Sequence, residues 1–203
     1  MREFLIIGSG PQGRMIAETV NNYYKHYTVV QADNHTDIGT DIKEGIVAIG
    51  DIQIRLKVVN YVLEKIPDFQ FKYIIHPSVI FGEGVNIGKG CMLMPGVIIN
   101  NGAVIGEHCL INSGAIVEHD NKISNFVNLQ PGVVTGGYVE VGEQSYVGIG
   151  AMIRDRVTIG SKCMIGMGSV VVKDIVDNAT AYGNPAKVVI YANVGNENEA
   201  DHR

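Results

Sequence analysis

The stretch NIGKGCMLMPGVIINNGAVIGEHCLI spans residues 86–111 and repeats one pattern every six residues. Large apolar side chains recur at Ile87, Leu93, Ile99, Ile105 and Ile111. Neither an α-helix nor an ordinary β-strand has a period of six, whereas a parallel β-helix does. The stretch therefore predicts a triangular prism in which three successive hexads make one coil.

The repeat extends in both directions, from Ile75 to Val171. Of the seventeen positions at this spacing, sixteen are large and apolar, and only Thr135 departs. The 25 glycines of the chain fit the tight corners of such a prism, because corners need positive φ or a close backbone approach. Seventeen hexads make more than five coils, about 25–30 Å tall at roughly 4.8 Å per coil.

The three cysteines occupy one register of the repeat. Cys91, Cys109 and Cys163 stand at the small inward position, separated by whole coils. This placement favours small core side chains over a redox or metal role.

Residues 1–74 follow a different pattern, in which strand and helix signals alternate. We predict strands at 3–7, 27–33, 45–50 and 71–75 and a helix over 11–25. A second helix is expected after an N-cap at Asp51. The expected core faces are Ile16, Val20 and Tyr23 for the first helix, and Ile52, Leu56, Val59, Leu63 and Ile66 for the second. This alternation predicts a small parallel sheet.

The chain thus divides into an α/β half-Rossmann domain at 1–74, a β-helix with a C-terminal extension at 75–192, and a polar tail at 193–203.

The composition of the chain excludes some classes of function. A hydrophobic content of 46% supports a folded core, and a net charge of −5 without a basic patch argues against nucleic-acid binding. No stretch approaches the roughly 18 apolar residues of a membrane span. Cysteines without motif spacing indicate a cytoplasmic protein.

One acid–histidine–acid triplet, Glu118-His119-Asp120, interrupts the apolar repeat. His119 falls on the outward side of a corner, and Gly137 follows one coil later. A histidine base beside an exposed backbone amide is the layout of acyl transfer, and either acid is placed to orient the imidazole. The alternative is a solvated turn residue.

The other histidines lack comparable acidic neighbours in the sequence. His108 is expected on the solvated surface, and His76 where the two domains meet. No pair of histidines has the spacing of metal ligands, so we predict no metal site.

The loop GSGPQG (8–13) follows a predicted strand and precedes a predicted helix, and Asp33 lies near the end of the second strand. This pattern is typical of dinucleotide-binding folds. Only half of such a domain is present, so we interpret the loop as a cradle for the phosphates of a smaller nucleotide. NAD binding and an unliganded glycine turn are the alternatives.

Nearly the whole chain resembles the left-handed β-helix acyltransferases of the sialic-acid O-acetyltransferase and bacterial nucleotide-sugar N-acetyltransferase group. The resemblance rests on the glycine loop, VAIGDIQIR (47–55), IIHPS (74–78), the hexads, EHD (118–120) and GNPAK (183–187). It implies an acetyl-CoA-dependent N-acetyltransferase acting on an amino group, expected to be a 4-amino group, of a nucleotide-linked deoxy sugar. The alternatives are O-acetylation of sialic acid or a related sugar, and a non-catalytic binding protein.

The resemblance also implies site residues. His119 matches the catalytic base, Asp120 the acid that raises its basicity, and Gly137 the oxyanion donor. The positions expected to contact acetyl-CoA are Asn128, Gly148, Ile149, Gly166 and Met167. The positions expected to contact the nucleotide sugar are Gly10, Pro11, Gln12, Ala32, Asp33 and Gly50.

Three of these positions depart from the pattern of the group. Many relatives have histidine in place of Gln12, some have an acid in place of Ala32, and a second histidine usually stands in place of Asn128. The group also implies a homotrimer with the active site between neighbours. We expect its interface to involve apolar residues on the outside of the prism: Met92, Met94, Ile98, Val104, Leu110 and Ile116.

Overall fold

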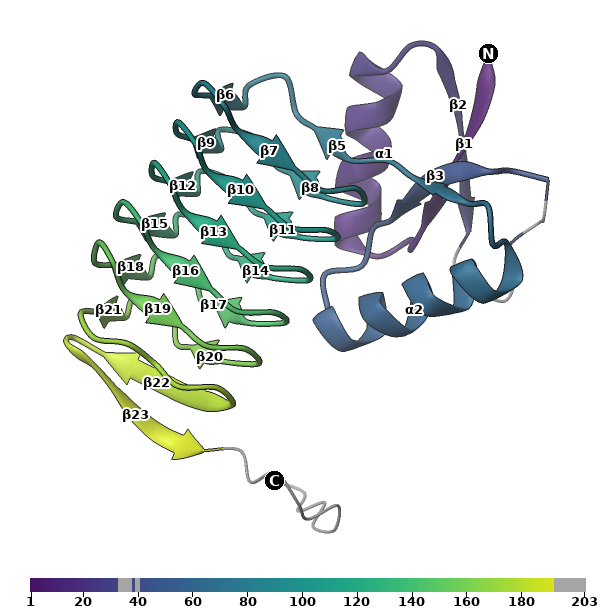
Figure 1. Cartoon of the computed structure of the whole chain (residues 1–203). Coiled ribbons are helices and arrows are strands. Elements are labelled where there is room, and N and C mark those ends of the chain that lie inside the picture. The colour runs from purple at the N-terminus through teal and green to yellow at the C-terminus, as the bar shows by residue number, and fades with distance from the viewer. Residues whose placement is uncertain (33–37, 39–40, 192–203) are drawn as a thin grey trace, which may run out of the picture.

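The computed structural model describes residues 1–32, 38 and 41–191. These residues form a small α/β domain and a β-prism that lie side by side (Figure 1). Asp33 and the predicted tail at 193–203 lie outside the described residues. In the part of the chain that is described, no helix is long and apolar enough to cross a membrane.

The N-terminal domain is built on a parallel sheet of order β2-β1-β3-β4. Its elements along the chain are β1 (Arg2–Ile7), α1 (Pro11–Tyr23), β2 (Tyr27–Ala32), β3 (Glu44–Val47), α2 (Ile52–Lys65) and β4 (Gln70–Phe71). Alternate residues of β1 face opposite sides: Phe4 packs in one cluster with α1, and Leu5 in another with α2. The predicted small parallel sheet is therefore confirmed.

Both helices turn a slightly different face inward than the apolar pattern predicts. In α1, Ile16 and Val20 are buried as expected, but Tyr23 is exposed. In α2 the buried residues are Ile52, Arg55, Val58, Val59 and Val62, whereas Leu63 is exposed. In α2, Ile52, Val59 and Ile66 are thus buried as predicted, and the prediction was wrong for Leu63, because the buried Arg55 occupies part of the inner face.

The prism has three flat parallel sheets, and successive strands visit them in turn. Face 1 contains β5 (Ile74–Ile75), β8 (Met92–Leu93), β11 (Leu110–Ile111), β14 (Asn128–Leu129), β17 (Tyr146–Val147) and β20 (Met164–Ile165). Face 2 contains β6 (Ile80–Phe81), β9 (Ile98–Ile99), β12 (Ile116–Val117), β15 (Val134–Thr135), β18 (Met152–Ile153) and β21 (Val170–Val171). Face 3 contains β7 (Asn86–Ile87), β10 (Val104–Ile105), β13 (Lys122–Ile123), β16 (Glu140–Val141) and β19 (Thr158–Ile159).

Each strand pairs with the strands one coil above and below it, as Ile116 does with Ile98 and Val134. From β8 to β21 the second residue of each strand is buried, and the apolar ones form one continuous core with the three buried cysteines, whereas Phe81 in the first coil is exposed. Thr135 also lies inside, where its hydroxyl accepts a hydrogen bond from the Glu118 N–H at 3.1 Å. The six-residue period, the three faces and the core role of the cysteines are thus confirmed.

The lower end of face 1 is extended by a hairpin. Strand β22 (Ala179–Gly183) continues the parallel stack below β20, and β23 (Ala186–Tyr191) pairs with it in the antiparallel sense. At the upper end, the chain passes directly from β4, the last strand of the N-terminal sheet, to β5, the first strand of face 1.

All corners share one backbone conformation. Every sixth residue from Gly84 to Gly168 has a positive φ between 54° and 74°. We name the corners by the faces they join. Corner 1–2 carries only glycine at this position, at residues 96, 114, 132, 150 and 168, whereas the other two corners carry several side chains.

The N-terminal domain docks against face 1. Met92, Met94 and Leu110 are buried there in a cluster with Phe4, Ile6 and α1. These three residues were predicted to line an interface between copies, and that prediction was wrong, because the chain's own N-terminal domain covers them. Ile98 and Ile116 lie on face 2, and Val104 lies on face 3. His76, in the turn between β5 and β6, meets Tyr23 of α1 edge-on at 5.3 Å, which confirms its place at the domain junction.

Candidate active site

His119 and Asp120 lie in the turn between β12 and β13, at corner 2–3. Figure 1 shows this turn on the side of the prism away from α1 and α2. His119 Nδ1 lies 2.9 Å from Asp120 Oδ2, and both side chains are about half exposed. The hydrogen bond to His119 lowers the pKa of the Asp120 carboxyl below its ordinary value. Because an ionised carboxylate only accepts, Nδ1 carries the proton of the neutral imidazole and Nε2 offers its lone pair.

Gly137 lies one coil below His119, and the imidazole rests directly on it. A Cβ at Gly137 would lie 2.5 Å from His119 Nε2 and 2.6 Å from Cε1, so only glycine leaves room for the ring. Among the described residues, the Gly137 N–H has no hydrogen-bond partner. A basic nitrogen and a backbone amide without a partner therefore lie on neighbouring coils of one corner, and their roles in catalysis stay a prediction.

The residues expected to bind acetyl-CoA divide into two groups. Gly148, Ile149, Gly166 and Met167 lie together at corner 1–2 of consecutive coils, with Ile149 and Met167 strongly exposed. A Cβ at Gly148 would lie 2.6 Å from the Met167 backbone nitrogen, so this glycine lets the coils stack closely. Corner 1–2 borders face 2 on the edge opposite to His119, so one chain does not bring this group to its own base.

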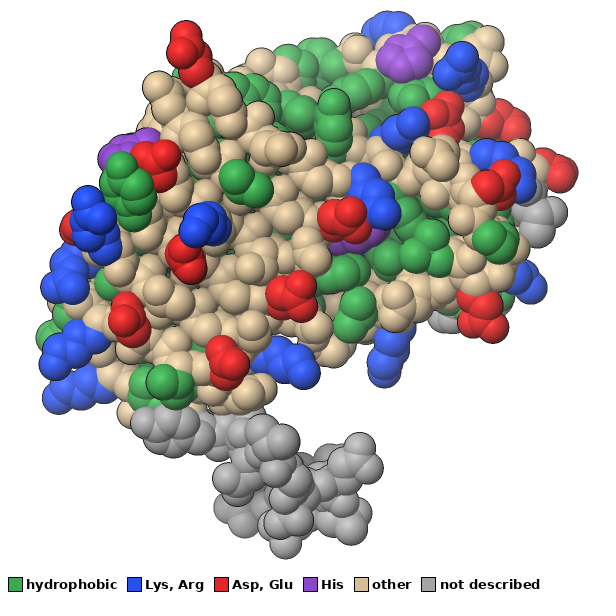
Figure 2. Space-filling model, in the orientation of Figure 1, with side chains coloured by type: hydrophobic (Ala, Val, Ile, Leu, Met, Phe, Trp, Pro, Cys, Tyr) green, Lys and Arg blue, Asp and Glu red, His purple; other side chains and the backbone are tan. Residues whose placement is uncertain are grey.

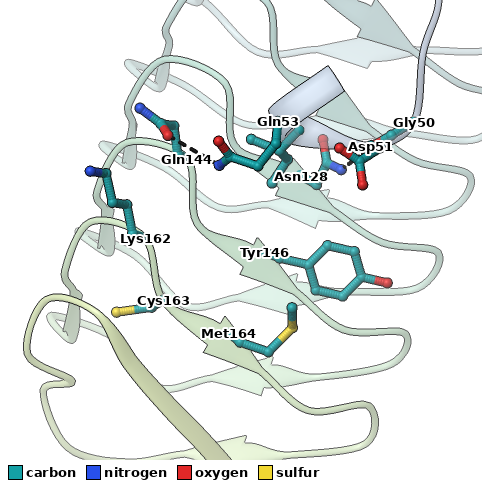
Figure 3. A pocket seen from close by; sticks show the side chains of 10 residues that line it. Gly50, Asp51, Gln53, Asn128, Gln144, Tyr146, Lys162, Cys163 and Met164 are labelled. Atoms are coloured by element: carbon teal, nitrogen blue, oxygen red, sulfur yellow. Dashed lines mark hydrogen bonds between the residues drawn. The ribbon is translucent and has the colours of Figure 1, made fainter. Parts of the chain in front are cut away.

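Asn128 is separate from that group. It is buried on face 1 beneath the N-terminal domain. Its Oδ1 accepts from Arg55 Nη2 at 2.6 Å, and its Nδ2 donates to the Gly50 carbonyl at 2.8 Å (Figure 3). Its contact with acetyl-CoA stays a prediction.

Arg55 is the residue that the sequence analysis missed. Its side chain is fully buried, and it donates further bonds to the carbonyls of His108 at 3.1 Å and Ile49 at 2.7 Å. Burial lowers its pKa to about 10. A cavity of about 370 Å³ lies beside this network, between α2 and the lower coils, where Gln53 bonds Gln144 at 3.3 Å (Figure 3). Arg55 ends the VAIGDIQIR stretch (47–55), but no role was assigned to it, because two of its acceptors, His108 and Asn128, come from distant segments.

The glycine loop turns tightly into α1. Gly8 has φ +117°, and a Cβ on Gly13 would collide with the Gly8 carbonyl, so both positions require glycine. Gly10 and Gly50 instead face open space, since a Cβ at either would meet nothing within 4 Å. Gln12 Nε2 lies 3.3 Å from Met94 Sδ of the prism, and Ala32 is buried at the end of β2.

The first turn of α1 lacks the groups that usually occupy a helix N-terminus. Gly10 provides no capping side chain, Pro11 follows it, and no acidic residue is present in this turn. In α2, by contrast, Asp51 accepts the Ile54 N–H at 2.8 Å. The end of α1 therefore leaves backbone donors and a positive dipole end available to an anion.

His108 was predicted to be a solvated surface residue, and that was wrong. Its ring is 2% exposed, stacks on Phe126 at 5.0 Å and meets Phe71 of the N-terminal domain edge-on at 4.7 Å. Its Nδ1 has no hydrogen-bond partner among the described residues. Desolvation, with Arg55 and Lys89 nearby, lowers its pKa to about 4. In the described ranges, no three His, Cys, Asp or Glu side chains are placed to hold a metal ion.

Comparison with known proteins extends these observations. Residues 78–113 and 138–173 match the family model described as "Bacterial transferase hexapeptide (six repeats)". The solved structure of PerB from Caulobacter crescentus in complex with CoA and GDP-perosamine is 31% identical. It superimposes with a TM-score of 0.82 over 93% of this chain and 97% of that chain. The chain belongs to the hexapeptide-repeat acyltransferases.

Two further proteins that this chain is similar to are also described as acetyltransferases. The acetyltransferase domain of PglB from Neisseria gonorrhoeae, in complex with acetyl coenzyme A, is 28% identical with a TM-score of 0.85, over 93% of this chain and 99% of that chain. The galactoside O-acetyltransferase of Escherichia coli is 39% identical over 51 residues, 25% of each protein. This chain therefore spans about a quarter of the length of the curated relatives it matches.

Proposed function

We propose that this acyltransferase moves the acetyl group of acetyl-CoA to an amino group, expected at the 4-position, of a nucleotide-linked deoxy sugar. The observation that carries the proposal is the His119–Asp120 pair at 2.9 Å, whose imidazole lies against Gly137. The names of the solved relatives support the substrates, since PerB was crystallised with CoA and GDP-perosamine.

The chemistry follows from the positions of three groups. His119 Nε2 takes a proton from the sugar amine as the nitrogen attacks the thioester carbonyl of acetyl-CoA. The Gly137 N–H donates to the oxyanion of the tetrahedral intermediate. The carbon–sulfur bond then breaks, and the imidazolium protonates the departing CoA thiolate. Asp120 holds the imidazole with its proton on Nδ1 and stabilises the imidazolium.

The nucleotide is assigned to the N-terminal domain. The uncapped first turn of α1 and the open space at Gly10 fit a diphosphate that approaches the backbone. Gly50 offers a second open backbone position after β3. Acetyl-CoA is assigned to corner 1–2, where Ile149 and Met167 present apolar side chains to the pantetheine arm.

A complete site then requires more than one copy. The His119 corner borders face 2 on one edge, and the acetyl-CoA corner borders it on the other. The outward residues of face 2 are all apolar: Ile80, Ile98, Ile116, Val134, Met152 and Val170. Face 3, by contrast, carries the Lys122–Glu140 ion pair, and over the prism Figure 2 shows scattered acidic and basic side chains with few hydrophobic ones.

Exposed apolar columns mark interfaces. We assign face 2 to a parallel homotrimer, in which corner 2–3 of one copy meets corner 1–2 of its neighbour. The base of one copy then reaches the acetyl group held by the next.

The test measures CoA thiol release with a panel of nucleotide-linked amino sugars and free sialic acid, in wild type and His119→Ala. We expect turnover with an amino sugar that requires its nucleotide, and a loss of at least about 100-fold in His119→Ala. Turnover with a free sugar hydroxyl alone would favour the O-acetyltransferase alternative, which the E. coli relative supports. No turnover with any acceptor would favour a binding protein.

A further inference from the structure

Corner 2–3 differs from corner 1–2 in the residues that take the left-handed conformation. Its first two coils use Gly84 and Gly102, but the next three use Asp120, Tyr138 and Arg156, with φ of 57°, 58° and 60°. Glycine adopts this conformation without strain, whereas side chains do so at a cost. Corner 3–1 also carries side chains in this conformation, so what distinguishes corner 2–3 is the set of contacts that its three side chains make with His119 and with one another.

These side chains touch one another. The Tyr138 ring meets the His119 imidazole edge-on, with centroids 5.2 Å apart and planes at 90°. The Arg156 guanidinium lies over the Tyr138 ring, 4.6 Å from its centroid. The backbone ties the coils in the same order, since Tyr138 N–H donates to the His119 carbonyl at 3.0 Å and Arg156 N–H to the Gly137 carbonyl at 2.9 Å.

Asp120 receives a second contact from the same tyrosine. After the larger effect of His119, the Tyr138 hydroxyl also helps to keep the pKa of the Asp120 carboxyl low. The imidazole is therefore bounded below by Gly137, at Nδ1 by Asp120 and on a third side by Tyr138. Without the Tyr138 ring, a half-exposed histidine has no contact on that side to prevent its rotation.

We propose that Tyr138 is a positioning residue that holds the His119–Asp120 pair in its productive orientation, and that Arg156 holds Tyr138 in turn. The proposal rests on the proposed function, because it concerns the base of the same reaction. It assigns the contacts of Tyr138 and Arg156 to the alignment of His119 Nε2 with the Gly137 amide.

The kinetic test compares Tyr138→Asn with Tyr138→Phe. Asn tolerates the left-handed conformation, so Tyr138→Asn should keep or raise the melting temperature while kcat falls roughly 10- to 100-fold. The KM for acetyl-CoA and for the acceptor should stay within about twofold. Tyr138→Phe keeps the ring and should keep most of kcat. The acidic limb of its kcat/KM profile should move to higher pH, because Asp120 has lost a donor.

Tyr73→Asn is the matched control, since it removes an exposed tyrosine that lies just before β5, three coils above Tyr138, and it should leave kcat unchanged. Arg156→Gln should reproduce part of the Tyr138→Asn loss. A raised KM for acetyl-CoA with unchanged kcat would overturn the proposal and make the ring a cofactor contact. A melting temperature that falls together with kcat would make Tyr138 a structural residue only.

A second measurement does not depend on turnover. In wild type, nitrogen-detected NMR of the neutral His119 ring should show the proton on Nδ1, and Tyr138→Asn should shift the ring toward a mixture of tautomers. An unchanged tautomer in Tyr138→Asn would overturn the positioning role. An enzyme without turnover whose tautomer still responds to Tyr138 would contradict the proposed function and leave the positioning role supported.

Discussion

Replacing Gly137 with alanine tests the geometry of the base directly. The new methyl group would lie 2.5 Å from His119 Nε2, whereas ordinary contact begins at 3.4 Å, so the imidazole must withdraw by about 0.9 Å. The obstacle is the end of a side chain rather than backbone, so the ring moves and the coil does not. A displacement of about 1 Å in a reacting group costs on the order of 100-fold in rate, and we expect kcat to fall by about that factor.

Stability should move the other way. The φ of Gly137 lies outside the left-handed region, so alanine fits the backbone without strain. Gly→Ala at a compatible position stabilises a protein by about 0.4–1 kcal/mol, because it restricts the unfolded chain. Thermal unfolding of Gly137→Ala should therefore show an equal or higher melting temperature, and any loss of activity is not a loss of fold.

The assay is steady-state CoA release at saturating acetyl-CoA, in a double-mutant cycle with His119→Ala. The alanine keeps its backbone N–H, so the oxyanion donor remains, and the loss reports on the imidazole alone. Once His119 is removed, Gly137→Ala should cost less than about twofold more. A Gly137→Ala enzyme within about threefold of wild-type kcat would refute the assigned geometry, as would a full second loss in the double mutant.

Three further predictions concern the domain junction and the assembly. His108 has a folded pKa of about 4 against an ordinary 6.5, so the unfolded chain binds its proton first. Stability is complete above pH 6.5 and should fall by about 3 kcal/mol toward pH 4, with the decline reduced in His108→Phe and measured by urea unfolding. Arg55→Met leaves Asn128 Oδ1 and several buried carbonyls without a donor, and should cost about 3 kcal/mol or more in the same assay; a cost below about 1 kcal/mol would contradict the network. Ile116→Glu on face 2 should reduce the mass by light scattering from about 66 kDa to the 22.0 kDa of one chain, and an unchanged mass would exclude face 2 as the interface.

The prism could be predicted from the sequence because its order is local. Each hexad forms one face and one corner, so the identity of positions such as Ile99 and Ile105 already determines what points inward. The same arithmetic placed Gly137 under His119, since residues three hexads apart stack. Nothing in that prediction required knowledge of distant contacts.

Errors gathered where the two domains meet. Met92 and Leu110 were expected on the outside of the prism, at an interface between copies, but α1 and its sheet cover them. His108 looked like an outward corner residue until Phe71 of the N-terminal domain closed over it. Arg55 shifted the inner face of α2 because the carbonyl of His108 and the amide of Asn128 receive its donors. Periodicity describes each part alone and carries no information on how the parts dock.

The stacked corners also restrict how chains of this kind can change in length. One coil takes three hexads, so inserting a single hexad within the prism would rotate every lower coil by one face. Such an insertion between Asp120 and Gly137 would carry the oxyanion donor to a different edge and dismantle the site. A whole added coil would preserve every alignment below it and lower that part by roughly 4.8 Å. Related proteins that keep this chemistry should therefore differ in prism length by whole coils of three hexads.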